Sequence, residues 1–317
     1  MSLQFQYNFS SNYLSDDTIQ NTVDNTDLNC ILYNNPSIGQ ASAPNNTNQS
    51  IYFNGSNKQY GLVSPFTSNN NGMTFSVWFK ATTQNGTWSR IFDLGNGPAS
   101  NNIIMFINNG YLGFSVYWNE PNSPNPSYQS YEVNNVIPNV LNNQWNHVVW
   151  VLNGSWPNGW TIYFNGTLFT TYEQGWYPPI VERRNNYIAK SNWSSNPSFW
   201  GNICDFRFYD TMLTSAQARG VYYGLTIFIS TFAYQGCYND ENSRAIPTYL
   251  QNVTTTQQCQ QLAYDNDAQV FGVQDGGQCF IGNSLSTAQK YGVNNSNCGK
   301  LGGSWNNQVY YSTTEPN

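Results

Sequence analysis

The sequence predicts a mainly β protein, in which one large β domain precedes a small α+β module held together by disulfides. Of the 317 residues, 16% are aromatic and only 9% are charged, a composition that is typical of a loop-rich all-β chain. The length accommodates a β domain of about 200 residues or more together with a second, small domain. Four of the six cysteines follow residue 232, in a segment too short for a large core, which favours stabilisation by disulfides.

The strongest strand signal runs from residue 200 to residue 210. Its period-two alternation predicts an apolar face with Cys204, Phe206 and Phe208 and an opposite face with Asp205, Arg207 and Tyr209. Because Asp205 and Arg207 are two residues apart on one face, we expect them to form a structural ion pair. A turn and a short helical run follow this strand.

Alternation and β-forming residues predict further strands along the first 200 residues. They lie at 3–10, 28–33, 50–56, 59–65, 73–80, 90–94, 102–107, 112–118, 144–152, 160–167, 168–171 and 186–191. Asn165 and Gly166 predict a tight turn that joins two of these strands as a hairpin. Near the C-terminus, residues 255–265 predict a helix that is capped by Thr255 or Thr256 and carries Cys259 on its inward face.

In their order, these motifs resemble those of the laminin-G-like, concanavalin A-like jelly-roll family. The last strand and its turn follow the family's pattern of Asp-x-Arg, Tyr-Asp and Leu-Thr over residues 205–214. The Trp-x-His pattern at 145–147 and the apolar run at 186–191 resemble two other strands of the family. The resemblance implies a two-sheet jelly-roll sandwich, a lectin-like domain, over residues 1–225, in which His147 has a packing role.

Residues 232–315 resemble the WSC family, a small cysteine-stapled module of cell-wall and extracellular proteins. The resemblance rests on Cys-Tyr-x-Asp at 237–240, Arg-Ala-Ile-Pro at 244–247 and Gly-Gly-Ser-Trp at 302–305. WSC modules usually carry eight cysteines, whereas this segment has four, so it is similar to a reduced member of the family.

The four cysteines of this module predict two disulfides. Of the three pairings that four cysteines allow, the favoured one joins the helix to a strand and the two ends of the module to each other: Cys259–Cys279 and Cys237–Cys298. In the large domain Cys30 and Cys204 remain. We favour two buried free thiols, because free cysteine packs as a small apolar residue; a disulfide between them is the alternative.

Aromatic residues in polar loops are the candidate ligand-binding residues. They lie among Asn, Pro, Gly and Ser rather than on alternating strands: Trp118, Trp156, Trp176, Tyr177 and Trp193. Clusters of exposed rings mark binding surfaces, flat rings suit the C–H surfaces of sugars, and neighbouring Asn amides offer paired donors and acceptors. The alternative is that these rings only fasten long loops to the sandwich.

No catalytic residue is predicted. Glycosidases on related jelly rolls use paired carboxylates from one strand, and none of the six glutamates has that spacing. Calcium is common in the family, and Asp16, Asp17 and Asp93 are the candidate ligands; no other cofactor is expected. His147 is the single histidine, so it cannot form a metal cluster with others.

Charge and hydropathy exclude two kinds of partner. A net charge of −6 with only 11 Lys and Arg leaves no basic stripe for nucleic acid. No apolar run reaches the roughly 18 residues that a membrane-spanning helix needs. The N-terminus has neither the basic region nor the apolar region of a signal peptide.

The leading hypothesis for function is a non-enzymatic carbohydrate-binding or adhesion protein whose partners are glycans or a host cell surface. The Asn-rich chain without a leader resembles lectin-like surface proteins of large DNA viruses. That resemblance implies a virion surface or another extracellular location, with other particle proteins as further partners. The alternative is a structural minor capsid or fibre component that binds no glycan. A glycoside hydrolase or lyase is the least favoured class.

Overall fold

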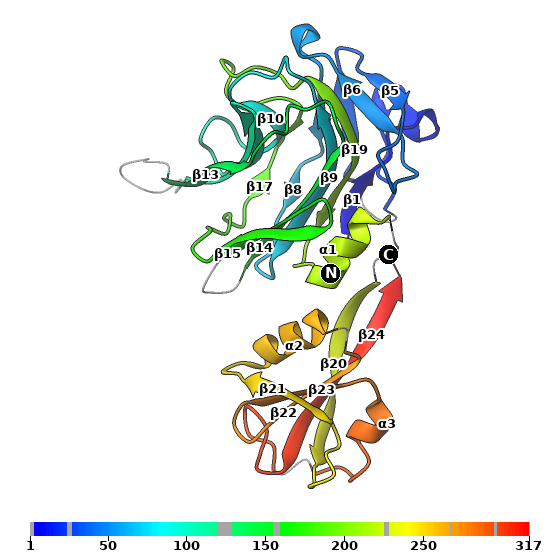
Figure 1. Cartoon of the computed structure of the whole chain (residues 1–317), viewed down its shortest axis with the longest axis vertical. Coiled ribbons are helices and arrows are strands. Elements are labelled where there is room, and N and C mark those ends of the chain that lie inside the picture. Colours follow the sequence, from blue (N-terminus) through cyan, green and yellow to red (C-terminus); the bar gives the residue numbers. More distant parts are fainter. Residues whose placement is uncertain are drawn as a thin grey trace. The chain divides into compact units, whose positions relative to one another are not determined.

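A computed structural model describes the chain except for residues 1–2, 24–26, 120–128, 155–158, 225–227, 267, 295–296 and 317. The mainly β fold class is confirmed. The chain divides into two compact units, and each is described here by itself (Figure 1). The first unit comprises Met1–Leu213 with Ala218–Leu225, and the second comprises Thr214–Gln217 with Thr226–Asn317. The predicted domain limits, 1–225 and 232–315, stay a prediction.

Two antiparallel sheets build the first unit, with β10 and β13 in one layer and β9, β14 and β19 in the other (Figure 1). Sheet A has the order β16-β15-β14-β9-β19-β6-β5, and β1 pairs with β19. Its strands are β1 (Leu3–Tyr7), β5 (Ser37–Gln40), β6 (Ser50–Phe53), β9 (Met73–Ala81), β14 (Asn146–Asn153), β15 (Gly159–Phe164), β16 (Thr167–Tyr172) and β19 (Gly201–Tyr209).

Sheet B has the order β13-β12-β11-β10-β18-β7-β4-β3-β2. Its strands are β2 (Leu14–Ser15), β3 (Thr18–Ile19), β4 (Cys30–Tyr33), β7 (Tyr60–Val63), β10 (Ser89–Gly95), β11 (Ile103–Asn108), β12 (Tyr111–Trp118), β13 (Gln129–Ile137) and β18 (Asn185–Ile188). A separate pair joins β8 (Phe66–Thr67) to β17 (Glu182–Arg183), and two short 3-10 helices lie at Ser11–Tyr13 and Gly55–Asn57.

The core of this unit lies between the two sheets. Phe75 on β9 packs against Phe208 on β19 at 5.0 Å between ring centroids and against Phe92 of sheet B at 5.2 Å. All three rings are buried, as the inward phase of their strands requires. Each sheet therefore has one face in the core and one outer face.

The alternation within β19 is interrupted, contrary to the sequence prediction. The pairing of β19 with β9 shifts register between Cys204 and Arg207, and Asp205 has a φ of 49°. This β-bulge places Ile203 and Phe206 in the core, whereas Cys204 packs on the outer face. The prediction that Cys204 shares a face with Phe206 is therefore wrong.

The two cysteines of the first unit are free and buried. Cys30 faces the core from sheet B, whereas Cys204 lies on the outer face of sheet A against Trp78. Because the two thiols lie on different sheets and on different sides, the alternative of a Cys30–Cys204 disulfide is wrong.

Helix α1 (Ser215–Tyr222) covers the outer face of sheet A. Its Ala218 and Val221 are buried, and Tyr222 stacks on Trp78 at 5.3 Å between centroids. His147 lies in the same layer, fully buried, with Nε2 2.9 Å from the hydroxyl of Ser76. Helix α1 is thus packed on the part of the outer face of sheet A that carries Trp78, Val149 and Tyr163.

The second unit is a five-stranded antiparallel sheet with the order β20-β24-β22-β23-β21. Its elements are β20 (Phe228–Asn239), β21 (Thr248–Asn252), α2 (Thr256–Asp265), β22 (Val270–Gln274), β23 (Gln278–Gly282), α3 (Leu285–Ala288) and β24 (Asn306–Pro316). None of the helices in the described part of the chain has the length and apolar character needed to cross a membrane.

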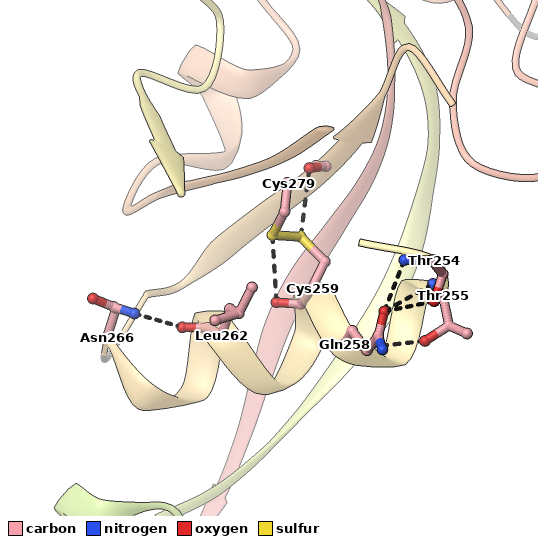
Figure 2. The surroundings of a disulfide bond; sticks show 8 residues. Thr254, Thr255, Gln258, Cys259, Leu262, Asn266 and Cys279 are labelled. Carbon is pink, nitrogen blue, oxygen red and sulfur yellow. Dashed lines mark hydrogen bonds between the residues drawn. A yellow bond between two sulfur atoms is a disulfide. The ribbon is translucent and has the colours of Figure 1, made fainter. Parts of the chain in front are cut away.

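Two disulfides with the predicted pairing hold this unit together. Cys259 of α2 is joined to Cys279 of β23, and Cys237 to Cys298 (Figure 2 shows the first). The helix begins as its sequence predicts: Thr255 Oγ1 accepts a hydrogen bond from Gln258 N at 3.2 Å, and Gln258 Oε1 accepts one from Thr255 N at 3.2 Å (Figure 2). This reciprocal capping box fixes the first turn and so sets which face of α2 carries Cys259.

Candidate functional site

The outer face of sheet B presents an aligned set of rings and polar side chains. Alternation puts these residues outside, because their chain neighbours, such as Leu32, Ile188 and Val116, face the core. Strand pairing then aligns them across the sheet: Tyr33 lies opposite Tyr60, and a second row runs through Leu62, Tyr187, Asp93, Ile104, Ser115 and Glu132. This face is built on paired strands, which hold side chains more firmly than loops do.

Asp93 fastens a loop over this face. The carboxylate is fully buried, and Oδ1 accepts hydrogen bonds from Asn102 Nδ2 at 2.7 Å and from Asn192 Nδ2 at 2.8 Å. Its Oδ2 accepts one from the backbone N–H of Asn192 at 2.8 Å. Burial raises the pKa of Asp93, and nearby Arg90 only partly offsets this. These bonds hold the loop that carries Trp193 in place.

Arg90 organises one cluster of rings, which we call the Arg90 cluster. Its guanidinium carbon lies 5.6 Å from the ring centroid of Trp88, 5.3 Å from that of Phe106 and 5.5 Å from that of Trp193. Trp193 in turn lies 5.3 Å from Tyr117. Arg90 itself is only 5% exposed, so its cation–π contacts orient the rings around it. Trp88, Trp193 and Tyr117 remain half-buried at the surface.

A glycine makes room for the Arg90 cluster. A Cβ on Gly113 would lie 2.4 Å from the tip of the Phe106 ring. Because Gly113 is opposite Phe106 across strands β11 and β12, the ring lies over the glycine on the outer face. Any larger residue at this position would displace Phe106 and, through it, Arg90.

A second group, the tyrosine cluster, comprises Tyr33, Tyr60, Tyr187 and Lys190. Tyr33 stacks on Tyr60 with centroids 4.6 Å apart and an interplanar angle of 4°, and Tyr60 meets Tyr187 edge-on at 5.6 Å. The ammonium of Lys190 lies 4.0 Å from the centroid of Tyr60 and 4.2 Å from that of Tyr187. Burial raises the pKa of Tyr60 and of Tyr187 and lowers the pKa of Lys190.

The ring residues predicted from sequence do not all gather on this face. Trp193 lies there, in the Arg90 cluster. Trp118 is 42% exposed but has the phase of the core residues of β12, so its side chain projects on the other side of the sheet. Trp176 and Tyr177 are half-buried against the core, and the Tyr177 hydroxyl donates to Asn69 O at 2.6 Å. Trp156 lies outside the described residues.

Sequence reasoning missed most of the residues that form the outer face. Tyr33, Tyr60 and Tyr117 lie within strands, and the prediction searched for rings in loops. The available signal was the outward phase of each strand, since a large ring in a position that alternation assigns to solvent is unusual. What the sequence could not provide was the strand order that brings the rings together.

The predicted calcium ligands Asp16 and Asp93 have different surroundings. Asp16 occupies the turn between β2 and β3, with a φ of 53°, whereas the oxygens of Asp93 accept hydrogen bonds from amides. Within the described ranges, no three His, Cys, Asp or Glu side chains come together in a way that could hold a metal ion. Calcium binding by Asp16, Asp17 and Asp93 stays a prediction.

Family profiles match both units. Residues 54–219 match the concanavalin A-like lectin/glucanases superfamily, and residues 234–308 match the WSC domain. No curated protein sequence matches the chain significantly.

Several solved structures are similar to parts of this chain. The binding domain of Paraclostridial Mosquitocidal Protein 1 has 14% identity and a TM-score of 0.49 over 81% of this chain and 62% of its own. Domain 4 of AbnA, a GH43 extracellular arabinanase from Geobacillus stearothermophilus in complex with arabinotriose, has 17% identity and a TM-score of 0.47 over 69% of this chain and 98% of its own. The Ruminococcus gnavus IT-sialidase CBM40 bound to α2,3 sialyllactose has 17% identity and a TM-score of 0.37 over 48% and 82%. The chain therefore spans less than two thirds of the first of these proteins.

Proposed function

The chain belongs to the concanavalin A-like lectin/glucanases superfamily, and we propose that it is a non-enzymatic carbohydrate-binding protein whose binding surface is the outer face of sheet B. The observation that carries the proposal is the alignment of half-exposed rings on that face. Trp88, Trp193 and Tyr117 surround Arg90, while Tyr33 stacks on Tyr60. Ring faces offer flat apolar contact to the C–H faces of a sugar.

Preorganisation supports a binding role. The rings are held by a buried cation, by a buried carboxylate and by paired strands, so few degrees of freedom need to be lost when a ligand binds. Asp93 holds the Trp193 loop through the amides of Asn192.

The carboxylates of this face favour binding over hydrolysis. Glycoside hydrolysis needs two carboxyl groups that flank the glycosidic bond, one of them free to donate a proton. The oxygens of Asp93 are bound by amides inside the protein, and Glu132 accepts a hydrogen bond from Asn134 at 2.9 Å. Both therefore have structural partners.

We also propose an extracellular location, with a virion surface as the specific form and a host cell surface or other particle proteins as partners. The Cys237–Cys298 and Cys259–Cys279 disulfides support an oxidising environment. A structural particle component that binds no sugar is the second candidate. This structural role is favoured by Trp176 and Tyr177, whose rings pack against the core and hold their loop in place.

A glycan array followed by calorimetry on the best ligand tests the proposal. Tyr33→Ala and Trp193→Ala should each weaken binding by about 1 kcal/mol, or about fivefold, because each removes one stacking ring. Trp118→Ala and Tyr249→Ala remove exposed rings that lie elsewhere, 42% and 50% exposed, and should leave affinity unchanged. Thermal unfolding of each variant controls for folding. An array without any bound glycan would favour the structural candidate.

A further inference from the structure

We propose that the tyrosine cluster is a subsite for the anionic group of an acidic saccharide, with Lys190 as the residue that binds the anion and Tyr33 as the ring that contacts the sugar. This inference rests on the proposed function, because it assigns a ligand class to one part of the same face. It assigns the Arg90 cluster no part in recognising the anion.

Lys190 is held firmly by two ring faces. Strand β18 ends at Ile188, and Ala189 separates it from Lys190. Ala189 has a φ of 65° and turns the chain at the end of the strand. The ammonium then lies 4.0 Å and 4.2 Å from the centroids of Tyr60 and Tyr187. Two such contacts fix the position of an otherwise flexible side chain.

The hydrogen-bonding capacity of Lys190 is left for a ligand. An ammonium has three N–H donors, and ring faces attract its charge without accepting hydrogen bonds as oxygen does. Within the part of the chain that the structure describes, no hydrogen bond and no carboxylate within 4.0 Å is found for Lys190 Nζ. Arg207 and Arg244, in contrast, are paired with Asp205 and Asp240.

The carboxylate on the neighbouring strand, Asp93, is not available to pair with Lys190. Asp93, on the neighbouring strand, is fully buried and bound by amides. Asp93 is therefore already satisfied and does not compete for Lys190, although the whole chain carries −6.

A bound anion would stabilise the charged form of Lys190, which partial burial destabilises. Partial burial lowers the pKa of Lys190, which means that the charged form has lost hydration without gaining an opposite charge. A carboxylate or sulfate accepts short, charge-assisted hydrogen bonds from an ammonium. Tyr33 is 37% exposed and stacks on Tyr60, the ring that Lys190 contacts. It would offer its ring to a neighbouring residue of the saccharide whose anionic group Lys190 binds.

Calorimetry with three probes tests the inference: trigalacturonate, the matching neutral trigalactoside and a sulfated form of that trigalactoside. Wild-type protein should bind the two acidic probes about tenfold more tightly than the neutral one, since hydrogen bonds to charged groups are the strong ones. Lys190→Met keeps the length and the apolar contact with the rings but removes the charge, so it should abolish this preference and leave neutral binding unchanged. Lys58→Met is the control and should retain the preference. Comparison of the carboxylated and sulfated probes shows which anion the subsite prefers.

The outcomes separate this inference from the function on which it rests. Equal wild-type affinity for acidic and neutral probes, or a preference that survives Lys190→Met, overturns the subsite while carbohydrate binding stands. Failure of the wild-type protein to bind any of the three probes or any glycan on an array overturns the proposed function and this inference with it.

Discussion

Arg207 binds Asp205 through two hydrogen bonds within one strand: Nε donates to Oδ1 at 2.9 Å and Nη2 to Oδ2 at 2.6 Å. The bulge at Asp205 makes this fork possible, because its φ of 49° turns the carboxylate toward a residue two positions on. Gln6, Asn46 and Asn48 also donate to the carboxylate. Burial alone would raise the pKa of Asp205, but the opposing pull of Arg207 and these donors lowers it. The pair therefore joins strands β1 and β19 and the loop before β6.

Removing one partner of this pair should be costly. Arg207→Ala leaves a buried carboxylate with its main counter-charge gone, and we expect a loss of about 3–5 kcal/mol in the free energy of unfolding. Arg184→Ala is the matched control. Its ion pair with Glu182 has side chains that are 67% and 46% exposed, so its removal should cost no more than about 1 kcal/mol. Chemical denaturation measures both. Similar costs for the two variants would contradict the role given to Arg207.

Acid should destabilise the first unit through its one histidine. Burial lowers the pKa of His147 to about 3, whereas an unfolded histidine titrates near 6.5. Between these values the unfolded chain binds a proton that the folded chain does not, so stability falls as pH falls. The loss should reach about 2 kcal/mol between pH 6.5 and pH 5.

His147→Gln isolates this effect. Other groups titrate in both proteins, including Asp93, whose raised pKa acts in the opposite direction as the pH rises. They cancel when the two stability curves are subtracted. The difference between wild type and His147→Gln should shrink or reverse toward pH 5, and parallel curves would show that the pKa of His147 is the same in the folded and unfolded chains.

The disulfides of the second unit should contribute unequally. They close loops of 61 and 20 residues, and in the chain-entropy treatment the larger loop stabilises by about 1 kcal/mol more. Replacing Cys237 and Cys298 together by Ala should therefore lower the melting temperature of this unit more than replacing Cys259 and Cys279. Calorimetry resolves the unfolding transitions of the two units. The first unit has no disulfide among its described residues, so its melting temperature should be unchanged in both variants.

Gly113→Ala should damage the Arg90 cluster although it replaces none of its rings. The added methyl would meet Phe106 at 2.4 Å, and such overpacking costs about 1–3 kcal/mol. Sugar binding should weaken as Arg90 and Trp193 shift. Gly86→Ala is the control, because its Cβ would meet only Pro197 at 3.5 Å. Unchanged binding in Gly113→Ala would mean that Phe106 does not position the rings.

Local sequence patterns predict most of the strands of the first unit, but they miss the edge strand β13 and the bulge in β19. The alternating runs at 73–80, 112–118 and 144–152 correspond to β9, β12 and β14, because burial on one face imposes the period. β13 escaped prediction, since its edge position leaves both faces largely exposed and the alternation weak. The bulge in β19 escaped because it depends on Asp205 finding partners that lie more than 150 residues away in sequence.

The candidate site was harder to predict than the fold. Trp193 was found because it lies in a polar loop, but its neighbours Trp88 and Arg90 come from another part of the chain. The stacking of Tyr33 on Tyr60 needs the register of β4 against β7. Register is a property of two strands together, and one sequence without its tertiary pairing does not determine it.

The hydrogen bond between Asn192 and Asp93 would be altered in a cell that glycosylates the chain at Asn192. Asn192-Trp193-Ser194 is an acceptor sequence for N-linked glycosylation, which attaches its sugar to Nδ2. That nitrogen donates to Asp93 Oδ1 at 2.8 Å and to Asn185 O at 3.1 Å. A covalent glycan would replace one of these hydrogens and place a bulky chain beside Trp193. A cell that glycosylates the nascent chain at Asn192 would therefore produce a protein whose Trp193 loop keeps the backbone hydrogen bond to Asp93 but has lost part of its side-chain anchor, whereas a cell without that modification would leave both in place.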